Sequence, residues 1–324
     1  MRTVRAPMRR IVVPLICAAA TLVLVTTTAW ALITPTKVLL LPGSQYFPFS
    51  NGTYLAYTSN SKAKPKHYNA YARRDSDGKT FRINEPNTEG FDGGFDPGTD
   101  TAVYQQIQRR TSDIYTYNLD TRTRHKLPKK KVNTPKWEWD PRISTSFISF
   151  FRDAYDSYSG KWYTHVFIYD RVTDRTREIP GAGYPAGRPR NGSVGERYAT
   201  WDVCGKQTCS VYLFDMKTRT PEKIPSAGGL PQYAPVVDET NGLLFFARSG
   251  FGCGKGVKID EVPVATPRVT PTEVATLPRG IDLADGASLA LNTGTNMYDY
   301  FFSQVRCPNH PAHIYAFEGV SPGP

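Results

Sequence analysis

The chain has 324 residues, of which 21% are charged and 12% are aromatic, and it contains 26 glycines and 26 prolines. Abundant Tyr, Phe, Gly and Pro with few long apolar helical patterns favour an all-β architecture over a helical one. The formal net charge of +11 favours an anionic partner.

The N-terminal segment has the pattern of an export signal. An uncharged apolar run extends from Ile11 to Ile33 after four arginines, and Ala29-Trp30-Ala31 supplies a small-x-small cleavage site. An uncleaved membrane anchor is the alternative, because about 20 apolar residues can span a bilayer. Either reading places the residues after Thr34 outside the cytoplasm. We therefore expect a signal segment, 1–31, followed by a single domain, 32–324. Nucleic acid is excluded as a partner by the compartment.

A repeat follows the signal, and Gly93–Pro128 is its most regular copy, with four short strands and three tight turns. The last strand of each copy tends to end in an apolar residue followed by Pro. These ends are Leu41-Pro42, Ile83-Asn84, Leu127-Pro128, Ile179-Pro180, Ile224-Pro225 and Leu277-Pro278. Their spacing of 42 to 53 residues is typical of propeller blades.

The sixth copy has three C-terminal strands and no fourth, whereas Lys37–Pro42 is a spare fourth-type strand at the N-terminus. We expect this strand to complete the last blade and close the ring, since closure removes exposed edges. The alternative is that it is merely the tail of the signal. The predicted fold is a six-bladed β-propeller of four-stranded blades.

The repeat resembles that of the TolB-like β-propellers, an aromatic-Ser/Asp-Pro-Asp-Gly core followed by a buried strand. Phe95-Asp96-Pro97-Gly98 matches it best, followed by Trp139-Asp140-Pro141 and Phe49-Ser50-Asn51-Gly52. The resemblance covers Lys37–Val320 and implies the fold. It says little about function, because such propellers serve both as binding platforms and as appendages of enzymes.

The long connections are expected on one face of the ring, where function is generally carried. They are Ser59–His67, Glu85–Gly93, Pro128–Glu138, Arg152–Trp162, Gly181–Arg190 and Phe251–Gly256. Basic and aromatic residues alternate along them. The candidate ligand-binding residues are Lys129, Lys130, Lys131, Trp137, Tyr155, Tyr158, Tyr184, Arg188 and Arg190. Such a surface favours an acidic polymer, a phospholipid headgroup layer or an acidic protein. Alternatively, the cations only solubilise the propeller.

Four cysteines follow the signal, an even number that indicates two disulfides in an exported chain. Cys204 and Cys209 flank a hairpin tip, where opposite residues can meet disulfide geometry. Cys253 and Cys307 occupy the same loop of neighbouring copies and form the second expected pair. Neither pair has C-x-x-C spacing, which argues against a redox-active or metal-bound role.

Motifs that indicate metal binding or nucleophilic catalysis are weak or missing in the sequence. Cys307, His310 and His313 are interrupted by prolines. Asp92, Asp96 and Asp100 have the spacing of no recognised calcium loop, and the last two fit the turn after the first strand. No Gly-x-Ser-x-Gly motif is present. We expect no metal or cofactor.

The carboxylates Glu138 and Asp140 lie two residues apart on an expected inner strand, so both can face a central channel. Glycosidase chemistry would need two carboxyls at a defined separation. The favoured function is a monomeric, noncatalytic binding or scaffold propeller of the cell envelope that contacts a protein or anionic polymer. A secreted lyase or hydrolase with its site in the channel is the alternative.

Overall fold

The computed structural model describes residues 36–39, 44–61, 64–96, 99–109, 111–185, 189–205, 208–249, 256–276, 281–292, 297–306 and 313–320. The chain divides into two units at Ala31 and Leu32, and all described residues belong to the second. The export signal and the alternative anchor lie outside the described residues. In the described part, no helix is both long and apolar enough to cross a membrane.

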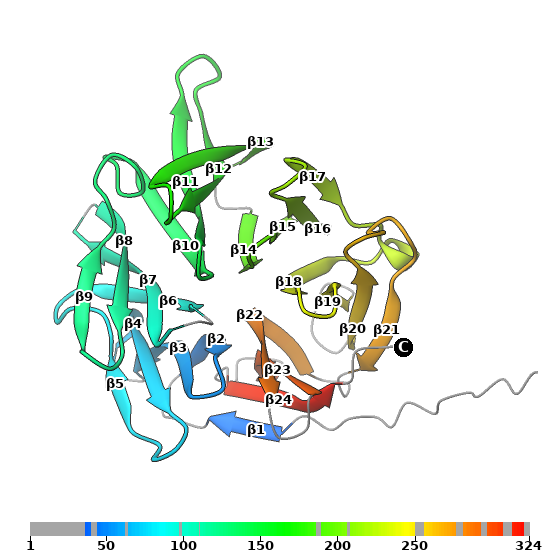
Figure 1. Cartoon of the computed structure of the whole chain (residues 1–324), viewed down its shortest axis with the longest axis horizontal. Helices are drawn as coiled ribbons and strands as arrows, with labels where there is room; N and C mark the ends of the chain where they lie inside the picture. The colour runs from blue at the N-terminus through cyan, green and yellow to red at the C-terminus, as the bar shows by residue number, and fades with distance from the viewer. Residues whose placement is uncertain are drawn as a thin grey trace, which may run out of the picture. The chain divides into compact units, whose positions relative to one another are not determined.

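The described strands form an all-β propeller of four-stranded antiparallel blades. Within five blades the four strands are consecutive in the chain, and Figure 1 shows them side by side in that order. The first blade has β2 (Gln45–Ser50), β3 (Tyr54–Ser61), β4 (Lys64–Arg74) and β5 (Thr80–Arg82). The second has β6 (Glu89–Phe95), β7 (Thr101–Gln108), β8 (Thr111–Asn118) and β9 (Thr123–Lys126).

The third blade has the longest strands of the five: β10 (Trp137–Ile143), β11 (Phe147–Asp156), β12 (Lys161–Asp170) and β13 (Arg175–Pro185). The fourth has β14 (Pro189–Val194), β15 (Tyr198–Cys204), β16 (Cys209–Asp215) and β17 (Thr220–Lys223). A short 3₁₀ helix, η1 (Ala227–Gly229), precedes the fifth. The fifth has β18 (Gln232–Asp238), β19 (Leu243–Ser249), β20 (Val257–Pro263) and β21 (Thr272–Thr276).

One further sheet combines strands from the two ends of the chain. It pairs β22 (Ile281–Asn292), β23 (Met297–Arg306) and β24 (His313–Val320) with β1 (Thr36–Leu39), which lies antiparallel beside β24. We call it the mixed sheet. Blades made of four consecutive strands therefore number five among the described residues, rather than six.

The core lies between neighbouring blades, because a four-stranded blade cannot bury its own apolar faces. One cluster joins Phe49 and Tyr54 of the first blade to Phe95 and Tyr104 of the second. Equivalent clusters follow between the second and third, third and fourth, and fourth and fifth blades.

A ring stack also recurs between the second and third strands of the first four blades. The stacked pairs are Tyr57–Tyr71, Tyr104–Tyr115, Phe150–Phe167 and Trp201–Tyr212.

The first strand of every blade carries a break in register, which brings neighbouring first strands close together. A Cβ atom on Gly93 would lie 2.4 Å from the carbonyl oxygen of Pro141, and one on Gly192 would lie 2.3 Å from that of Pro235. Real Cβ atoms do not approach a carbonyl so closely, so only glycine fits at either position.

The break also corrects one expectation about the repeat motif. Phe49-Ser50-Asn51-Gly52 does enter the turn after the first strand, where the Asn51 side chain accepts hydrogen bonds from the amides of Thr53 and Tyr54. Trp139-Asp140-Pro141 lies instead inside β10, at its register break, with Asp140 at φ 50°. The triplet therefore does not have the turn position of Phe95-Asp96-Pro97-Gly98, whereas Asp140 does lie on an inner strand as expected. Pro141 resembles the proline of the turn motif in sequence, but it lies in the bulge of β10.

Asp96 and Asp100 are turn residues between β6 and β7, as expected. The Asp96 carboxylate accepts hydrogen bonds from Arg171 at 2.6 Å and Thr145 at 3.1 Å, so it joins the second blade to the third. The Asp100 carboxylate accepts one from Asn51 at 3.4 Å. Asp92, in contrast, is buried in β6.

Candidate functional site

The β11–β12 hairpin carries a group of exposed aromatic side chains. Its two ten-residue strands pair without interruption from Phe147–Asp170 to Asp156–Lys161. Tyr158 in the turn is 100% exposed, while Tyr155 and Trp162 are 56% and 55% exposed. Tyr155 and Trp162 face each other across the strands, with ring centroids 5.5 Å apart. We call Tyr155, Tyr158 and Trp162 the aromatic hairpin.

The turn of the aromatic hairpin is well defined by its own hydrogen bonds. The Asp156 carboxylate accepts from the Ser159 hydroxyl at 2.6 Å and from the Tyr158 amide at 3.0 Å. These bonds lower the pKa of Asp156, with the Ser159 bond contributing most. Gly160 at φ 67° completes the turn, a conformation that suits glycine. The exposed rings are thus held by an ordered turn.

The base of the hairpin is anchored to β10 by a buried ion pair. Arg152 Nε lies 2.8 Å from Glu138 Oε1, and the Arg152 guanidinium also donates to the carbonyls of Lys131 and Val132. Its plane lies 4.4 Å from the centroid of Phe167. Burial raises the pKa of Glu138, and hydrogen bonds from Thr134 and Arg152 oppose this effect. Glu138 is therefore used to hold the blade together.

The second expected channel carboxylate, Asp140, is also paired. Its Oδ1 lies 2.6 Å from Arg142 Nη1, and Arg142 Nε donates to the carbonyl of Gly192 at 2.9 Å. The same guanidinium lies over the ring of Phe49, 4.5 Å from its centroid. Arg142 thus reaches the first and fourth blades from the third and fills the space between their first strands. The two carboxylates do not form a free acid–base pair.

The lysines of the β9–β10 connection lie away from the aromatic hairpin. Lys129, Lys130 and Lys131 are exposed, and the Lys131 ammonium forms an ion pair with Asp174 in the turn between β12 and β13. That turn is at the opposite end of β12 from the hairpin tip, and ten strand residues span roughly 30 Å. The structure does not bring Lys131 together with the aromatic rings.

Of the remaining candidates, Trp137 is half-buried at the start of β10, and Arg190 is exposed on β14. Tyr184 packs inside the interface between the third and fourth blades, where its hydroxyl accepts a hydrogen bond from Trp201 Nε1 at 3.1 Å. Burial raises the pKa of Tyr184 to about 12. Its role in the structure is packing. Arg188 lies outside the described residues.

Trp162 was not among the candidate residues, although the sequence places it at the end of a long connection, and Lys161 was expected only as one of the cations of that face. Lys161 and Trp162 follow the turn directly, and Lys161 is exposed without an ion pair in the described part of the chain. The turn-forming Asp156 and Gly160 were the available signal, since a four-residue turn, 157–160, pairs Asp156 with Lys161 and places Trp162 opposite Tyr155.

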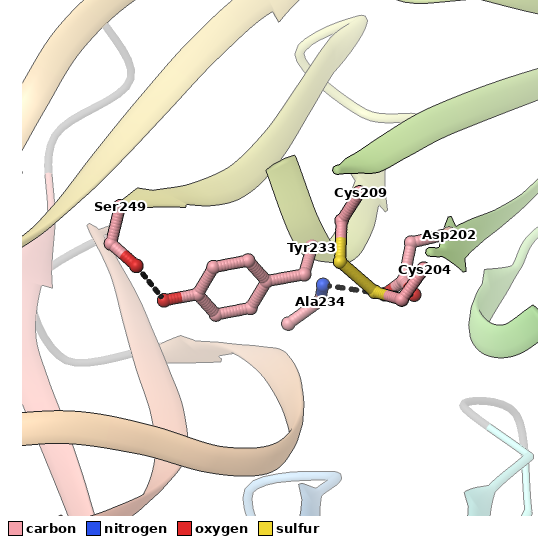
Figure 2. The surroundings of a disulfide bond; sticks show 6 residues. All are labelled: Asp202, Cys204, Cys209, Tyr233, Ala234 and Ser249. Atoms are coloured by element: carbon pink, nitrogen blue, oxygen red, sulfur yellow. Dashed lines mark hydrogen bonds between the residues drawn. A yellow bond between two sulfur atoms is a disulfide. The ribbon is translucent and has the colours of Figure 1, made fainter. Parts of the chain in front are cut away.

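The expected disulfide between Cys204 and Cys209 is present and joins the ends of β15 and β16 (Figure 2). On the same strand, the Asp202 carboxylate accepts a hydrogen bond from the amide of Ala234, at the register break of β18, at 2.9 Å. The disulfide therefore braces a hairpin that also ties the fourth blade to the fifth.

Cys253, Cys307 and His310 lie outside the described residues, as does the side chain of His313, and with them the second disulfide. Within the described ranges no group of three His, Cys, Asp or Glu side chains has a metal-binding arrangement.

Comparison with solved structures reveals the same type of propeller. TolB from Acinetobacter baumannii aligns with a TM-score of 0.53 at 11% identity, over 85% of this chain and 66% of that chain. An oligogalacturonate lyase in complex with manganese gives 0.53 at 11% identity, over 89% and 90%. A structure assigned as TolB from Agrobacterium tumefaciens gives 0.50 at 11% identity, over 86% and 91%.

These likenesses establish a TolB-like β-propeller at the level of fold. The chain spans just under two thirds of the TolB chain from Acinetobacter baumannii and most of the lyase. No family model and no curated protein sequence matches the chain. Because proteins of this fold carry unrelated activities, function has to be argued from the residues.

Proposed function

We propose that this protein is an exported binding propeller of the cell envelope, and that its aromatic hairpin contacts an anionic polymer. The main support for this proposal is the exposure of Tyr155, Tyr158 and Trp162 on one ordered hairpin. Single exposed apolar residues are common on protein surfaces, but adjacent large rings are typical of contact sites. Tyr and Trp also provide a large rigid contact area at a low cost in conformational entropy.

An acidic polysaccharide suits this surface chemically. Flat rings offer faces to the apolar sides of sugar units, and Lys161 beside Trp162 offers a cation to a carboxylate. The net charge of +11 draws such a polymer toward the protein and makes association dependent on ionic strength. An acidic envelope protein is the alternative ligand for the same surface, and its binding should be tested in parallel.

The proposal also includes export of the protein and closure of the propeller ring. The disulfide between Cys204 and Cys209 fits an oxidising compartment, in which such bonds persist. We infer that the mixed sheet acts as a sixth blade, which is supported by the pairing of β1 with β24 and by the contacts of β22 with β2 and β18. A closed ring would hold the aromatic hairpin on a rigid base.

Binding of the purified, exported protein to polygalacturonate at low and physiological salt tests the proposal. Replacing Tyr155, Tyr158 and Trp162 by Ser should weaken binding at least about tenfold, because stacking contributes on the order of 1 kcal/mol per ring. Val172→Ser is the matched control, since Val172 is 78% exposed at the other end of β12. Its binding should not change.

Equal binding by the triple variant and the wild type would overturn the role of the hairpin. No salt-sensitive binding of the wild type to this polymer or to envelope extracts would overturn the binding function itself. Release of unsaturated products from the polymer would instead identify a lyase.

A further inference from the structure

A cleft with an apolar floor separates the outer strands of the third and fourth blades. Its volume is about 250 Å³, and its floor is formed by Phe147, Ile168, Ile179, Phe214 and Met216. Charged side chains stand around its mouth: Asp170, Arg177, Glu178 and Arg219. Phe147, Ile168 and Asp170 lie at the opposite end of β11 and β12 from Tyr155, Tyr158 and Trp162, so the cleft is a separate feature of the molecule.

The cleft exists because β13 bulges where it passes the fourth blade. Glu178 pairs with Phe167 and Gly183 pairs with His165, which leaves residues 179–182 out of register. Ile179 and Ala182 turn inward, while Pro180 and Gly181 remain exposed. The facing outer strand, β17, has only four residues against eleven in β13, so it does not cover the bulge.

In the interface between the first and second blades, two arginine side chains cover the surface that corresponds to the cleft. Arg122, in the turn before β9, lies over the ring of Phe81, and Arg124 donates to the carbonyls of Ile83 and Asn84. In the fourth blade, Arg219 has the same turn position and the same positive φ as Arg122. Pro221 occupies the place of Arg124 and has no side-chain donor. The surface beside Ile179 therefore stays open.

Both carboxylates among the described residues at the mouth of the cleft have a partner within the third blade. Asp170 accepts hydrogen bonds from the amides of Val172 and Thr173, which lower its pKa, and Glu178 lies 2.8 Å from His165 Nδ1. Among the described residues, the guanidinium groups of Arg177 and Arg219 form no hydrogen bond or ion pair. Arg177 contributes only its charge to the lowered pKa of Asp170.

We propose that this cleft binds a medium-chain alkanoate, with its hydrocarbon chain on the apolar floor and its carboxylate at Arg177 and Arg219. An apolar cleft with a few convergent polar groups is the usual form of a small-molecule site. A cleft of about 250 Å³ lies just below the usual range of small-molecule pockets, which favours a hydrocarbon chain of moderate length over a long lipid chain. Arginine suits the ligand because its planar guanidinium matches a carboxylate.

Calorimetric titration with straight-chain alkanoates, below their aggregation concentrations, tests the proposal. Affinity should rise about fourfold for each added methylene and level off once the chain is longer than the apolar floor. The double variant Arg177→Gln/Arg219→Gln should lose at least about tenfold in octanoate affinity and keep its weak affinity for octanol. Arg175→Gln is the matched control, because Arg175 is exposed at the start of the same strand but lies outside the cleft lining.

Met216→Trp places a larger side chain on the apolar floor and leaves Arg177 and Arg219 unsubstituted. It should abolish binding of octanoate. Three results would overturn the proposal: no binding to the wild type, equal binding by the double arginine variant, or equal binding by Met216→Trp. The last would indicate adventitious association elsewhere on the surface. Unfolding midpoints of all variants identify any that fail to fold. If the double arginine variant fails to fold, Met216→Trp decides the outcome. If Met216→Trp fails to fold, the double arginine variant decides it.

Discussion

At the scale of single residues, buried charges near the first strands join blades to one another. Arg142 shows this most clearly, because it contacts Asp140 on its own strand, Gly192 of the fourth blade and Phe49 of the first. Breaking a buried pair of this kind leaves an uncompensated charge, which makes such residues sensitive to substitution. The carboxylates that invite a catalytic interpretation in the sequence thus have structural partners.

Asp92 is the buried carboxyl with the least support. It is 2% exposed, its Oδ1 accepts a hydrogen bond from the Gly94 amide at 3.3 Å, and its Oδ2 has no partner in the described part of the chain. Burial raises the pKa of Asp92 from 3.8 to about 8, an effect that the Gly94 bond and the charge of Arg142 oppose. The folded protein therefore holds a proton there at neutral pH.

This proton predicts a decline in stability with rising pH. Between about pH 4 and pH 8 the folded state keeps the proton that the unfolded state has lost, so the free energy of unfolding falls by up to about 1.4 kcal/mol per pH unit. Asp92→Asn keeps an acceptor for Gly94 and removes the titration. Urea unfolding of this variant should show a flatter pH dependence.

The exposed Asp120→Asn variant is the control for Asp92→Asn and should retain the wild-type slope. If the wild type and Asp92→Asn show the same slope across this range, the carboxyl of Asp92 is not protonated in the folded protein.

At the scale of elements, the register break in each first strand determines how closely blades pack. Phe47, Asp140 and Ala234 adopt positive φ at these breaks, which is strained for residues other than glycine. Hydrogen bonds from the preceding blade support the breaks, such as the one from the Ala234 amide to Asp202. A bulged strand that contacts its neighbour thus takes the place of a regular inner strand.

Gly93→Ala tests this close packing. The new methyl group would lie 2.4 Å from the Pro141 carbonyl oxygen and 2.9 Å from Val103 Cγ1, so we expect a loss of about 1–3 kcal/mol in the free energy of unfolding. Gly183→Ala is the control, because the nearest atoms to its Cβ belong to the half-buried side chain of His165 at 3.3 Å. Denaturant unfolding measures both, and equal stability of the two variants would contradict tight contact between β6 and β10.

At the scale of the whole molecule, stability depends on contacts between successive blades, since each cluster of the core spans two of them. Such an array leaves exposed edges unless its ends meet. The mixed sheet combines strands from both ends of the chain, which is the arrangement that a closing blade requires.

Deleting residues 36–42 from the full chain tests whether β1 closes the ring. An unpaired β24 edge should lower the unfolding midpoint and cause concentration-dependent association. Thr36→Ser/Lys37→Arg keeps the backbone pairing of β1 and should remain as stable and as monomeric as the wild type. Unchanged stability and unchanged size in gel filtration after the deletion would mean that the ring does not depend on β1.

The sequence alone determined the all-β class, the four-stranded repeat and the disulfide between Cys204 and Cys209, because turn residues, alternation and cysteine spacing are local signals. It placed Asp140 on an inner strand, as observed, but it did not distinguish the proline of the β10 bulge from a proline in the turn motif, because the two look alike until strands are paired.

Which charged side chains have a partner depends on the contacts between strands and blades. Glu138 and Asp140 are held by Arg152 and Arg142, and Lys131 by Asp174, whereas Lys161, Arg177 and Arg219 form no ion pair with any residue that the structure describes. The exposed rings of the aromatic hairpin and the cleft beside β13 likewise depend on which residues meet across strands and blades. Such contacts join residues distant in the chain, so no local pattern in the sequence encodes them.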